Sequence, residues 1–271
     1  MLSEIKKIPA FVIRDFRILF TYKLAFFSFT FNIVFTLFHL VLFGSMFNTA
    51  SSAVLSPYGN DFISYIVIGS IGWAFLWSIM TATSLSLRNE MMMGTLESII
   101  ITPTKTHTII FAYVIYGCLF GVLSMIILFI VGILFFDIFA FTSAGIFTLI
   151  IFILSATMMM GLGFVFSGLT IWIKNIGETV PILQNIVMFF CGVYFPITVL
   201  PEFLQPVANI MPFYYSIEGL RLSMLPKTPQ SELLYYTWIL LILSIIFMAI
   251  GLIVLKKGLI KAKKDGSLGF Y

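Results

Sequence analysis

The sequence holds few side chains that could carry chemistry inside its long apolar runs. Asn32, His39, Gln184 and Asn185 are the main polar residues there. Ionisable residues within a bilayer mark ion pathways and proton relays, so their scarcity argues against a proton-coupled carrier or an ion pump. No cluster of His, Asp, Glu or Cys has metal-ligand spacing, and no nucleophile is paired with a base. We therefore expect no metal site and no catalytic residues on this chain.

Two charged residues lie close together in the C-terminal third of the sequence. Glu218 and Arg221 are three residues apart, so on a helix they share one face and can form an ion pair. The simpler interpretation is structural, because each charge would neutralise the other near the bilayer. A direct role in binding a substrate is the alternative.

A polar segment between the second and third apolar runs reads RNEMMMGTLESIIITPT over residues 88–104. Gly94 permits a tight turn or a close approach, and Pro103 disfavours helical geometry at Thr102. Three consecutive methionines suit an adaptable apolar contact surface. We predict a short helix over residues 88–101 along the membrane surface, and a mere connection is the alternative.

The composition determines what kind of fold must position these residues. Of the 271 residues, 61% are hydrophobic and 10% are charged, and the mean hydropathy is +1.11. An average soluble domain is about half apolar and about a quarter charged. This excludes a soluble enzyme, a disordered chain and a disulfide scaffold. A nucleic-acid binder is also excluded, since Lys and Arg beside apolar spans set the orientation of those spans in the membrane. We predict an all-α polytopic membrane protein.

Six charge-free runs are long enough to cross a bilayer, which takes roughly 20 apolar residues. The predicted spans are residues 24–47, 62–87, 106–136, 138–173, 179–197 and 233–255. Residues 198–225 are also apolar, but several prolines interrupt them. Broken backbone at membrane depth must be shielded from lipid, so this stretch fits a re-entrant or interfacial hairpin better than a span. The whole chain, residues 1–271, then forms a single transmembrane domain.

The Lys and Arg residues predict the orientation of the spans. With the N-terminus in the cytoplasm, 13 of these residues fall on the cytoplasmic side and two, Arg221 and Lys227, fall outside. Positive residues favour the cytoplasmic side. We therefore expect a multi-pass protein of the cell (plasma or inner) membrane with both termini in the cytoplasm.

Residues 1–22 precede the first span and have an amphipathic helical pattern. The apolar residues of one face are Ile5, Ile8, Phe11, Val12, Phe16 and Leu19, and the basic residues opposite are Lys6, Lys7, Arg14 and Arg17. This pattern predicts an interfacial helix whose basic residues face lipid phosphates or a partner. A topology anchor is the simpler interpretation, and docking of a cytoplasmic subunit is the alternative.

The segment Glu90-x-x-x-Gly94-Thr95-Leu96-Glu97 with the later Thr102-Pro103 resembles the signature of the ABC-2 type (type V fold) exporter permeases. That family includes drug-export and lipooligosaccharide-export subunits. Its coupling helix sits in a groove of a separate ATPase subunit. The resemblance implies that Glu90, Gly94, Thr95, Leu96 and Glu97 contact the ATPase. Glu178, in the loop before the fifth span, is either a second contact or part of a capped turn.

A second match lies near the predicted hairpin. Residues 190–201 resemble the family's "small residue, Phe-Pro, then Leu-Pro" end of the fifth span, and residues 211–221 resemble the "Pro, Tyr, then Arg" segment that follows. In the family these residues form an outer re-entrant hairpin that covers the exit. The residues concerned are Pro196, Pro201, Pro212, Tyr214, Glu218 and Arg221.

In the family, spans two and five line a central path at the axis of a dimer. If this holds here, the path is apolar and aromatic, and Gln184 and Asn185 could orient a hydrophobic or amphiphilic cargo. The path residues would be Trp77, Met80, Gln184, Asn185, Met188, Phe189, Tyr194 and Phe195.

The resemblance therefore implies the permease subunit of an ATP-driven exporter, with a drug-like molecule or a lipid as cargo. Two such chains, expected as a homodimer, would associate with two ATPase subunits that bind ATP and Mg. This chain has no G-x-x-x-x-G-K-[ST] motif, so we expect no cofactor on it. Export of a lipid-linked glycan is the alternative. A stand-alone channel, a secondary carrier or an intramembrane enzyme would leave the segment from Glu90 to Glu97 unexplained.

Overall fold

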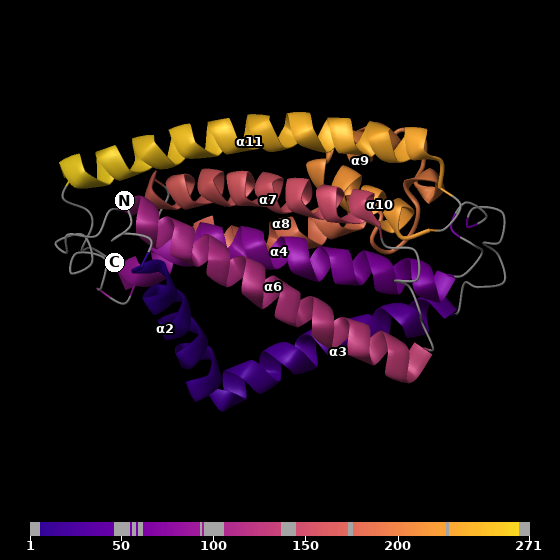
Figure 1. Cartoon of the computed structure of the whole chain (residues 1–271), viewed down its shortest axis with the longest axis horizontal. Coiled ribbons are helices and arrows are strands. Elements are labelled where there is room, and N and C mark those ends of the chain that lie inside the picture. Colours follow the sequence, from indigo (N-terminus) through magenta and orange to yellow (C-terminus); the bar gives the residue numbers. More distant parts are fainter. Residues whose placement is uncertain are drawn as a thin grey trace.

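The computed structural model describes residues 6–45, 55, 58, 62–92, 94, 106–136, 145–172, 176–225 and 228–265. Within them every regular element is a helix, which confirms the all-α fold (Figure 1). The helices are α2 (Ile8–Thr21), α3 (Lys23–Ser45), α4 (Phe62–Met92), α6 (Thr106–Phe136), α7 (Ile146–Trp172), α8 (Ile176–Phe190), the 3-10 turn η2 (Ile197–Val199), α9 (Gln205–Ile210), α10 (Pro212–Ser223) and α11 (Gln230–Asp265).

Four of these helices are long and apolar enough to cross a membrane, which confirms a multi-pass membrane protein. Their candidate spans are Phe62–Leu85, Thr108–Phe136, Ile146–Thr170 and Gln230–Lys261. Helices α2 and α3 form a fifth candidate only when taken together, and they are bent by 82° (Figure 1). Six crossings remain a prediction.

The fifth predicted span differs most from the structure. Residues 179–197 fall on α8, which has 15 residues and ends at Phe190. A helix of this length extends about 22 Å, less than the roughly 30 Å of hydrocarbon. Gly192 has a positive φ of 71° and Pro196 follows, so the backbone turns where the prediction continued the helix.

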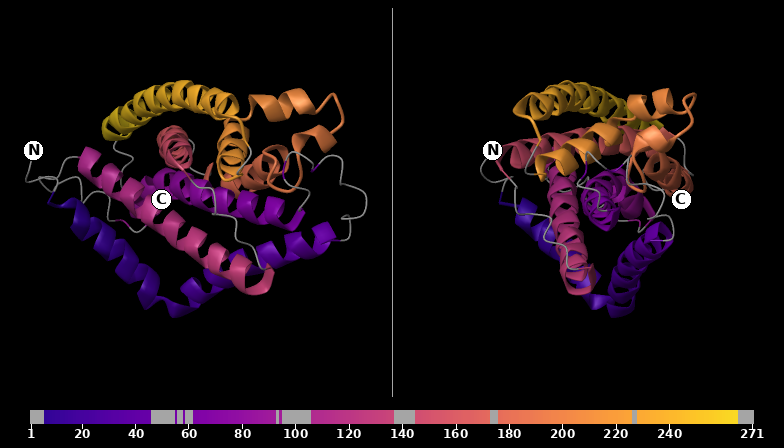
Figure 2. Two further views of the ribbon diagram at one scale, coloured as in Figure 1. Left: turned by 45° about the vertical axis from the view of Figure 1, so that its right-hand side comes forward. Right: turned by 90° about the vertical axis from the view of Figure 1, so that its right-hand side faces the viewer.

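Helix α4 occupies the centre of the bundle (Figure 2). In its most apolar window 72% of the span is buried, against 22% for α11 and 28% for α6. Val67, Leu76, Ile79 and Met80 have no exposed surface. The predicted second span continues past residue 87 to Met92, so residues 88–92 belong to α4 and not to a separate surface helix. No helix breaker occurs before Gly94, whose φ of 66° is left-handed.

Helix α2 packs through the apolar face that the sequence predicts. Val12 is buried, and the ring of Phe16 lies edge-on against Tyr116 of α6, with 5.1 Å between the ring centroids. Pro9 lies in the first turn, where it disrupts no helical hydrogen bond. The opposite face carries Arg17, which is exposed.

Glycines set the closest helix–helix contacts. The sequence has a G-x-x-x-G motif at Gly117 and Gly121 in the third apolar run and Gly161, Gly163 and Gly168 in the fourth, a pattern that predicts close helix packing. A Cβ at Gly121 of α6 would lie 3.0 Å from the carbonyl oxygen of Phe75 on α4. A Cβ at Gly251 of α11 would lie 2.3 Å from the carbonyl oxygen of Gly161 on α7. Such contacts allow two backbones to touch, which is how membrane helices gain packing energy.

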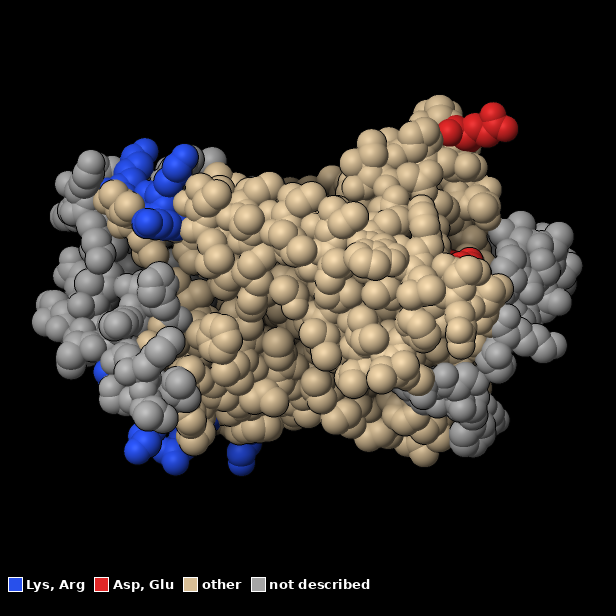
Figure 3. Space-filling view, turned by 45° about the horizontal axis from the view of Figure 1, so that its top comes forward, with Lys and Arg blue, Asp and Glu red and all other residues tan. Residues whose placement is uncertain are grey.

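Charged side chains gather at the two ends of the bundle (Figure 3). One end, which we call the basic end, carries the start of α2 with Lys6 and Lys7 and the end of α11 with Lys256, Lys257 and Lys261. The opposite end carries Glu202 and Glu232, both exposed. The prolines of residues 196–212 also lie at this opposite end, where they divide the chain into η2, α9 and α10.

Candidate functional site

A cavity of about 270 Å³ lies inside the bundle between α3, α4, α6 and α8. We call it the central cavity. Its lining combines aromatic and aliphatic side chains with amides and hydroxyls, and no charged residue contributes to the described lining. The lining residues are Phe29, Asn32, Ile33, Thr36, Leu37, Ser70, Trp73, Ala74, Trp77, Ser78, Leu128, Gln184 and Met188.

The indoles of Trp73 and Trp77 form the aromatic wall of the central cavity. Their rings are stacked with 5.1 Å between centroids, and Trp73 also packs against Phe213 of α10 at 5.7 Å. Ser78 donates its hydroxyl to the carbonyl of Ala74, on its own helix. The hydroxyl of Ser70 is buried and has no hydrogen-bond partner among the described residues. An unsatisfied buried hydroxyl costs about 1–3 kcal/mol, so it favours a polar group in the cavity.

The structure brings together only part of the predicted path. Trp77, Gln184 and Met188 line the central cavity. Met80 is fully buried in the core instead, and Asn185 and Phe189 are exposed on the outer side of α8. Tyr194 and Phe195 lie in the turn after α8, where the Tyr194 hydroxyl is 3.2 Å from the sulfur of Met188.

Sequence reasoning missed several of the polar lining residues. Asn32 stood out as a rare amide in the first apolar run, yet nothing in the sequence placed it opposite Gln184. Thr36, Ser70 and Ser78 gave no signal, because serine and threonine can bond to their own helix and are common in membrane helices.

A buried ionic cluster joins α4, α10 and the turn after α8 at the end opposite the basic end. Arg221 is 1% exposed and donates to the Glu218 carboxylate at 2.6 Å and to the carbonyl of Gly192 at 2.8 Å. Its guanidinium lies 3.6 Å from the ring centroid of Tyr65. The hydroxyl of Tyr58 donates to the other Glu218 oxygen at 2.5 Å.

The predicted ion pair of Glu218 and Arg221 is present, and its burial supports the structural interpretation. Among the other predicted hairpin residues, Pro196 is buried, Pro201 is exposed, and Pro212 begins α10. Tyr214 is half-buried and stacks edge-on against Tyr215. No sequence pattern indicates that Tyr58, Tyr65 and the Gly192 carbonyl complete the cluster.

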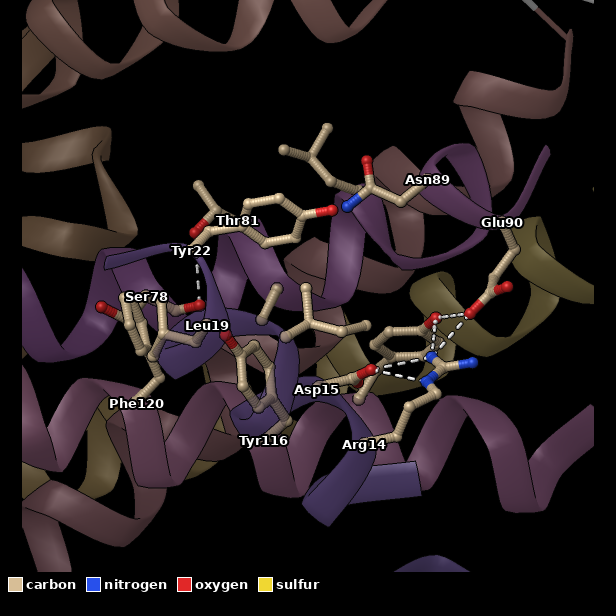
Figure 4. A pocket seen from close by; sticks show the side chains of 14 residues that line it. Arg14, Asp15, Leu19, Tyr22, Ser78, Thr81, Asn89, Glu90, Tyr116 and Phe120 are labelled. Carbon is tan, nitrogen blue, oxygen red and sulfur yellow. Dashed lines mark hydrogen bonds and ion pairs between the residues drawn. The ribbon is translucent and has the colours of Figure 1, made fainter. Parts of the chain in front are cut away.

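A second polar cluster ties α2 to the ends of α4 and α6 at the basic end (Figure 4). Arg14 donates to Glu90 at 2.7 Å and to the Tyr113 hydroxyl at 2.9 Å. Tyr113 also donates to Glu90, and Arg14 donates to Asp15 at 2.8 Å. Glu90 is 3% exposed.

Neighbouring groups in this second cluster raise the pKa of Arg14. Burial lowers the pKa of Arg14, but Tyr113, Asp15 and Glu90 together raise it above the ordinary value. Burial raises the pKa of the Asp15 carboxyl, and Arg14 offsets part of this increase. The cluster therefore holds the Arg14 guanidinium of α2 between the carboxyl groups of Asp15, also on α2, and Glu90 on α4, and the Tyr113 hydroxyl of α6 completes it.

The residues predicted to contact the ATPase lie in different environments, and some of them lie outside the described residues. Glu90 is buried and accepts a hydrogen bond from Arg14 of α2, and its contact with an ATPase stays a prediction. Gly94 forms a turn at the end of α4, and no described atom would lie within 4 Å of a Cβ there. Thr95, Leu96 and Glu97 lie outside the described residues. Glu178 lies in the first turn of α8, and its side chain also lies outside the described part of the chain.

Comparison with curated proteins finds no significant match. The family model for the ABC-2 type transporter matches residues 11–225. This range begins in α2 and extends just past α10, so it includes the central cavity, both polar clusters and the Gly94 turn. Since the match covers most of the chain, the protein belongs to the ABC-2 type transporter family and is a membrane-spanning permease of that type.

Proposed function

We propose that this chain is the permease subunit of an ATP-driven exporter that moves a hydrophobic or amphiphilic molecule, drug-like or lipid. The central cavity carries this proposal. Its lining is mostly apolar, with two tryptophans and a few amides and hydroxyls, which is the composition of sites for such ligands. A hydrated sugar polymer would need far more polar contacts than this lining supplies.

We propose that a second permease chain, most simply an identical one, completes a larger path for the cargo. The central cavity of about 270 Å³ lies just below the roughly 300–1,000 Å³ of typical ligand pockets. Next to it, α8 exposes Asn185 between Ile182 and Phe189. An amide exposed on a membrane helix favours contact with another helix over contact with lipid. We infer that two chains meet near this face of α8.

We further propose that two ATPase subunits dock at the basic end, on the cytoplasmic side, and bind ATP and Mg there. Residues 88–101 would contact them, and residues 198–225 would form an outer re-entrant hairpin over the exit. Because α4 is one unbroken helix from Phe62 to Met92, a push on its end would move Trp73 and Trp77 in the cavity wall. The pair of Arg14 and Glu90 would carry α2 with it.

Substitutions at Gly94 test whether binding of the ATPase depends on the backbone turn at this residue or on the size of its side chain. Asn tolerates a positive φ, whereas a β-branched residue does not. We expect Gly94→Asn to keep the ATPase partner and Gly94→Val to lose it. The measurement is mass spectrometry of soluble proteins that co-purify with the tagged chain from its native host in mild detergent.

The unmodified chain and Glu97→Lys complete this experiment. A P-loop ATPase that co-purifies with the unmodified chain, and is lost or uncoupled in Glu97→Lys, would support the exporter. If no ATPase co-purifies with any form of the chain, with or without nucleotide, the proposed ATP-driven function is wrong.

Removing the Gln184 amide from the central cavity is expected to weaken transport of the cargo. Gln184→Leu should raise the half-saturating dye concentration about two- to tenfold, because one lost hydrogen bond costs about 0.5–1.5 kcal/mol. The assay is ATP-dependent transport of the dye Hoechst 33342 in liposomes that contain the chain and its ATPase. Thr157→Val is the matched control, because this polar residue of α7 bonds to its own helix outside the cavity. Equal transport by both variants would contradict the cargo path.

A further inference from the structure

A second and larger cavity, of about 580 Å³, opens between α2, α4 and α6 (Figure 4). We call it the α2 cavity. It shares only Ser78 with the described lining of the central cavity, and α8 contributes nothing to it. It therefore lies apart from the path proposed above for the exported molecule. Its volume falls within the roughly 300–1,000 Å³ of ligand-binding pockets.

The α2 cavity changes from polar to apolar along its length. On α4 its lining extends from Glu90, beyond the candidate span, to Ser78, inside it. These positions are about 18 Å apart at 1.5 Å per residue. Asp15 and Arg14 lie at the Glu90 end, whereas Phe120 lies at the Ser78 end (Figure 4). A molecule that fills this cavity must have a polar head and an apolar body.

The charges at the polar end favour a cationic head. The described lining holds two carboxyl groups, Asp15 and Glu90, and one guanidinium, Arg14. Arg14 already donates to both carboxyl groups and to Tyr113, so its positive charge is neutralised within the cluster. In the described lining, carboxyl groups thus outnumber guanidinium groups by two to one, and the partly desolvated site strengthens the attraction of a carboxylate such as Asp15 for a cation.

Aromatic rings line the cavity from its polar end, where Tyr113 contacts Glu90, to its apolar end, where Phe120 lies, and they suit the same ligand. Tyr22, Tyr113, Tyr116 and Phe120 all contribute to the lining. The face of an aromatic ring attracts an organic ammonium group, and this attraction is strongest where water is excluded. Carboxylates together with several rings are a typical arrangement for recognising such a group.

We propose that the α2 cavity binds an amphiphile with an organic ammonium head. The ammonium lies between Asp15 and the ring of Tyr116, and the apolar body lies against Leu19, Leu85 and Phe120. Two sources share this chemistry, namely a phosphatidylethanolamine of the surrounding bilayer and a single-chain alkylammonium. Because Arg14 and Glu90 fasten α2 to α4 beside this site, an occupant would contact both helices.

Native mass spectrometry of the purified full chain tests this proposal. The probes are phosphatidylethanolamine against phosphatidylglycerol with the same acyl chains, and dodecyltrimethylammonium against dodecyl sulfate. We expect at least one ammonium probe to bind about fivefold or more tightly than its anionic counterpart, the factor that about 1 kcal/mol provides. Preference for the lipid alone or for the alkylammonium alone identifies the source.

Asp15→Asn is the main variant, because it removes one carboxylate and leaves the Arg14 bonds to Glu90 and Tyr113 in place. It should abolish the preference, and so should Tyr116→Leu, which removes a ring without changing a charge. Glu202→Gln is the matched control, an exposed acid at the opposite end of the bundle, and should change nothing. Equal binding of ammonium and anionic probes, or a preference that persists in Asp15→Asn and Tyr116→Leu, would overturn the proposal.

Discussion

Gly251→Leu is expected to prevent α11 from docking on α7 and to abolish a folded, monodisperse protein in detergent. A Cβ at residue 251 would lie 2.3 Å from the carbonyl oxygen of Gly161 and 2.9 Å from the Cβ of Phe164. Backbone cannot move aside as a flexible side chain can, so the helices must separate. Helix α11 packs mainly on α7, and its loss exposes one whole side of the bundle. The expected cost exceeds the roughly 1–3 kcal/mol of ordinary overpacking.

Alanine at two glycines gives a matched comparison. Gly251→Ala introduces the same clash in its smallest form, whereas a Cβ at Gly72 would meet Leu220 at an ordinary 3.6 Å. Thermal unfolding monitored by size-exclusion chromatography should show a lower Tm for Gly251→Ala and an unchanged or higher Tm for Gly72→Ala, since alanine is the better helix former. Equal Tm values for the two variants would show that the backbones do not touch at Gly251.

The glycines show which packing features the sequence predicts and which it does not. Their clustering predicted close packing, which the structure confirms, but did not identify the partner helices. A signal was available in the spacing. Gly161 and Gly168 on α7 are seven residues apart, as are Gly251 and Gly258 on α11. Gly161 contacts Gly251, and Gly168 contacts Gly258. Seven residues make nearly two turns, so both pairs stay on one face.

The sequence does not indicate contacts between residues that lie far apart in the chain. The family resemblance implies that Glu90 contacts an ATPase, and that contact stays a prediction. In the structure Glu90 is buried, since Arg14, separated by 76 positions, compensates its charge. Composition gives the membrane fold and local spacing gives single helices, but neither shows which polar groups meet across the bundle.

The fifth predicted span is helical only as far as Phe190, for a local reason that the hydropathy of the sequence does not show. Residues 179–197 are apolar almost throughout, yet α8 ends at Phe190. Gly192 has a positive φ, and its carbonyl accepts hydrogen bonds from Tyr65 and Arg221. An α-helix would hold that carbonyl within its own ladder. The buried arginine therefore depends on the end of α8 at Phe190, which leaves α8 with 15 residues.

Arg221→Met is expected to destabilise the protein by about 3–5 kcal/mol, the cost of breaking a buried ion pair by removing one partner. Methionine fills similar volume but leaves Glu218, which is 4% exposed, with a negative charge and no cation. The Gly192 carbonyl and the ring of Tyr65 lose their partner as well. The measurement is unfolding of the purified chain in increasing sodium dodecyl sulfate. Arg17→Met, an exposed arginine on α2, should stay within about 0.5 kcal/mol of the unmodified chain.

Removing both charges tests whether the ion pair itself stabilises the protein, or whether its attraction only offsets the cost of burying two charges. In Arg221→Met with Glu218→Gln, no buried charge remains, and the glutamine can still accept the hydrogen bond of Tyr58. Because desolvation offsets much of the attraction in a buried pair, the double variant should regain most of the stability lost in Arg221→Met. Arg221→Lys should not, since an ammonium cannot reproduce bonds to both Glu218 and Gly192 while lying on Tyr65. If the double variant is as unstable as the single one, the guanidinium contributes mainly through the Gly192 carbonyl and Tyr65, and the ion pair is secondary.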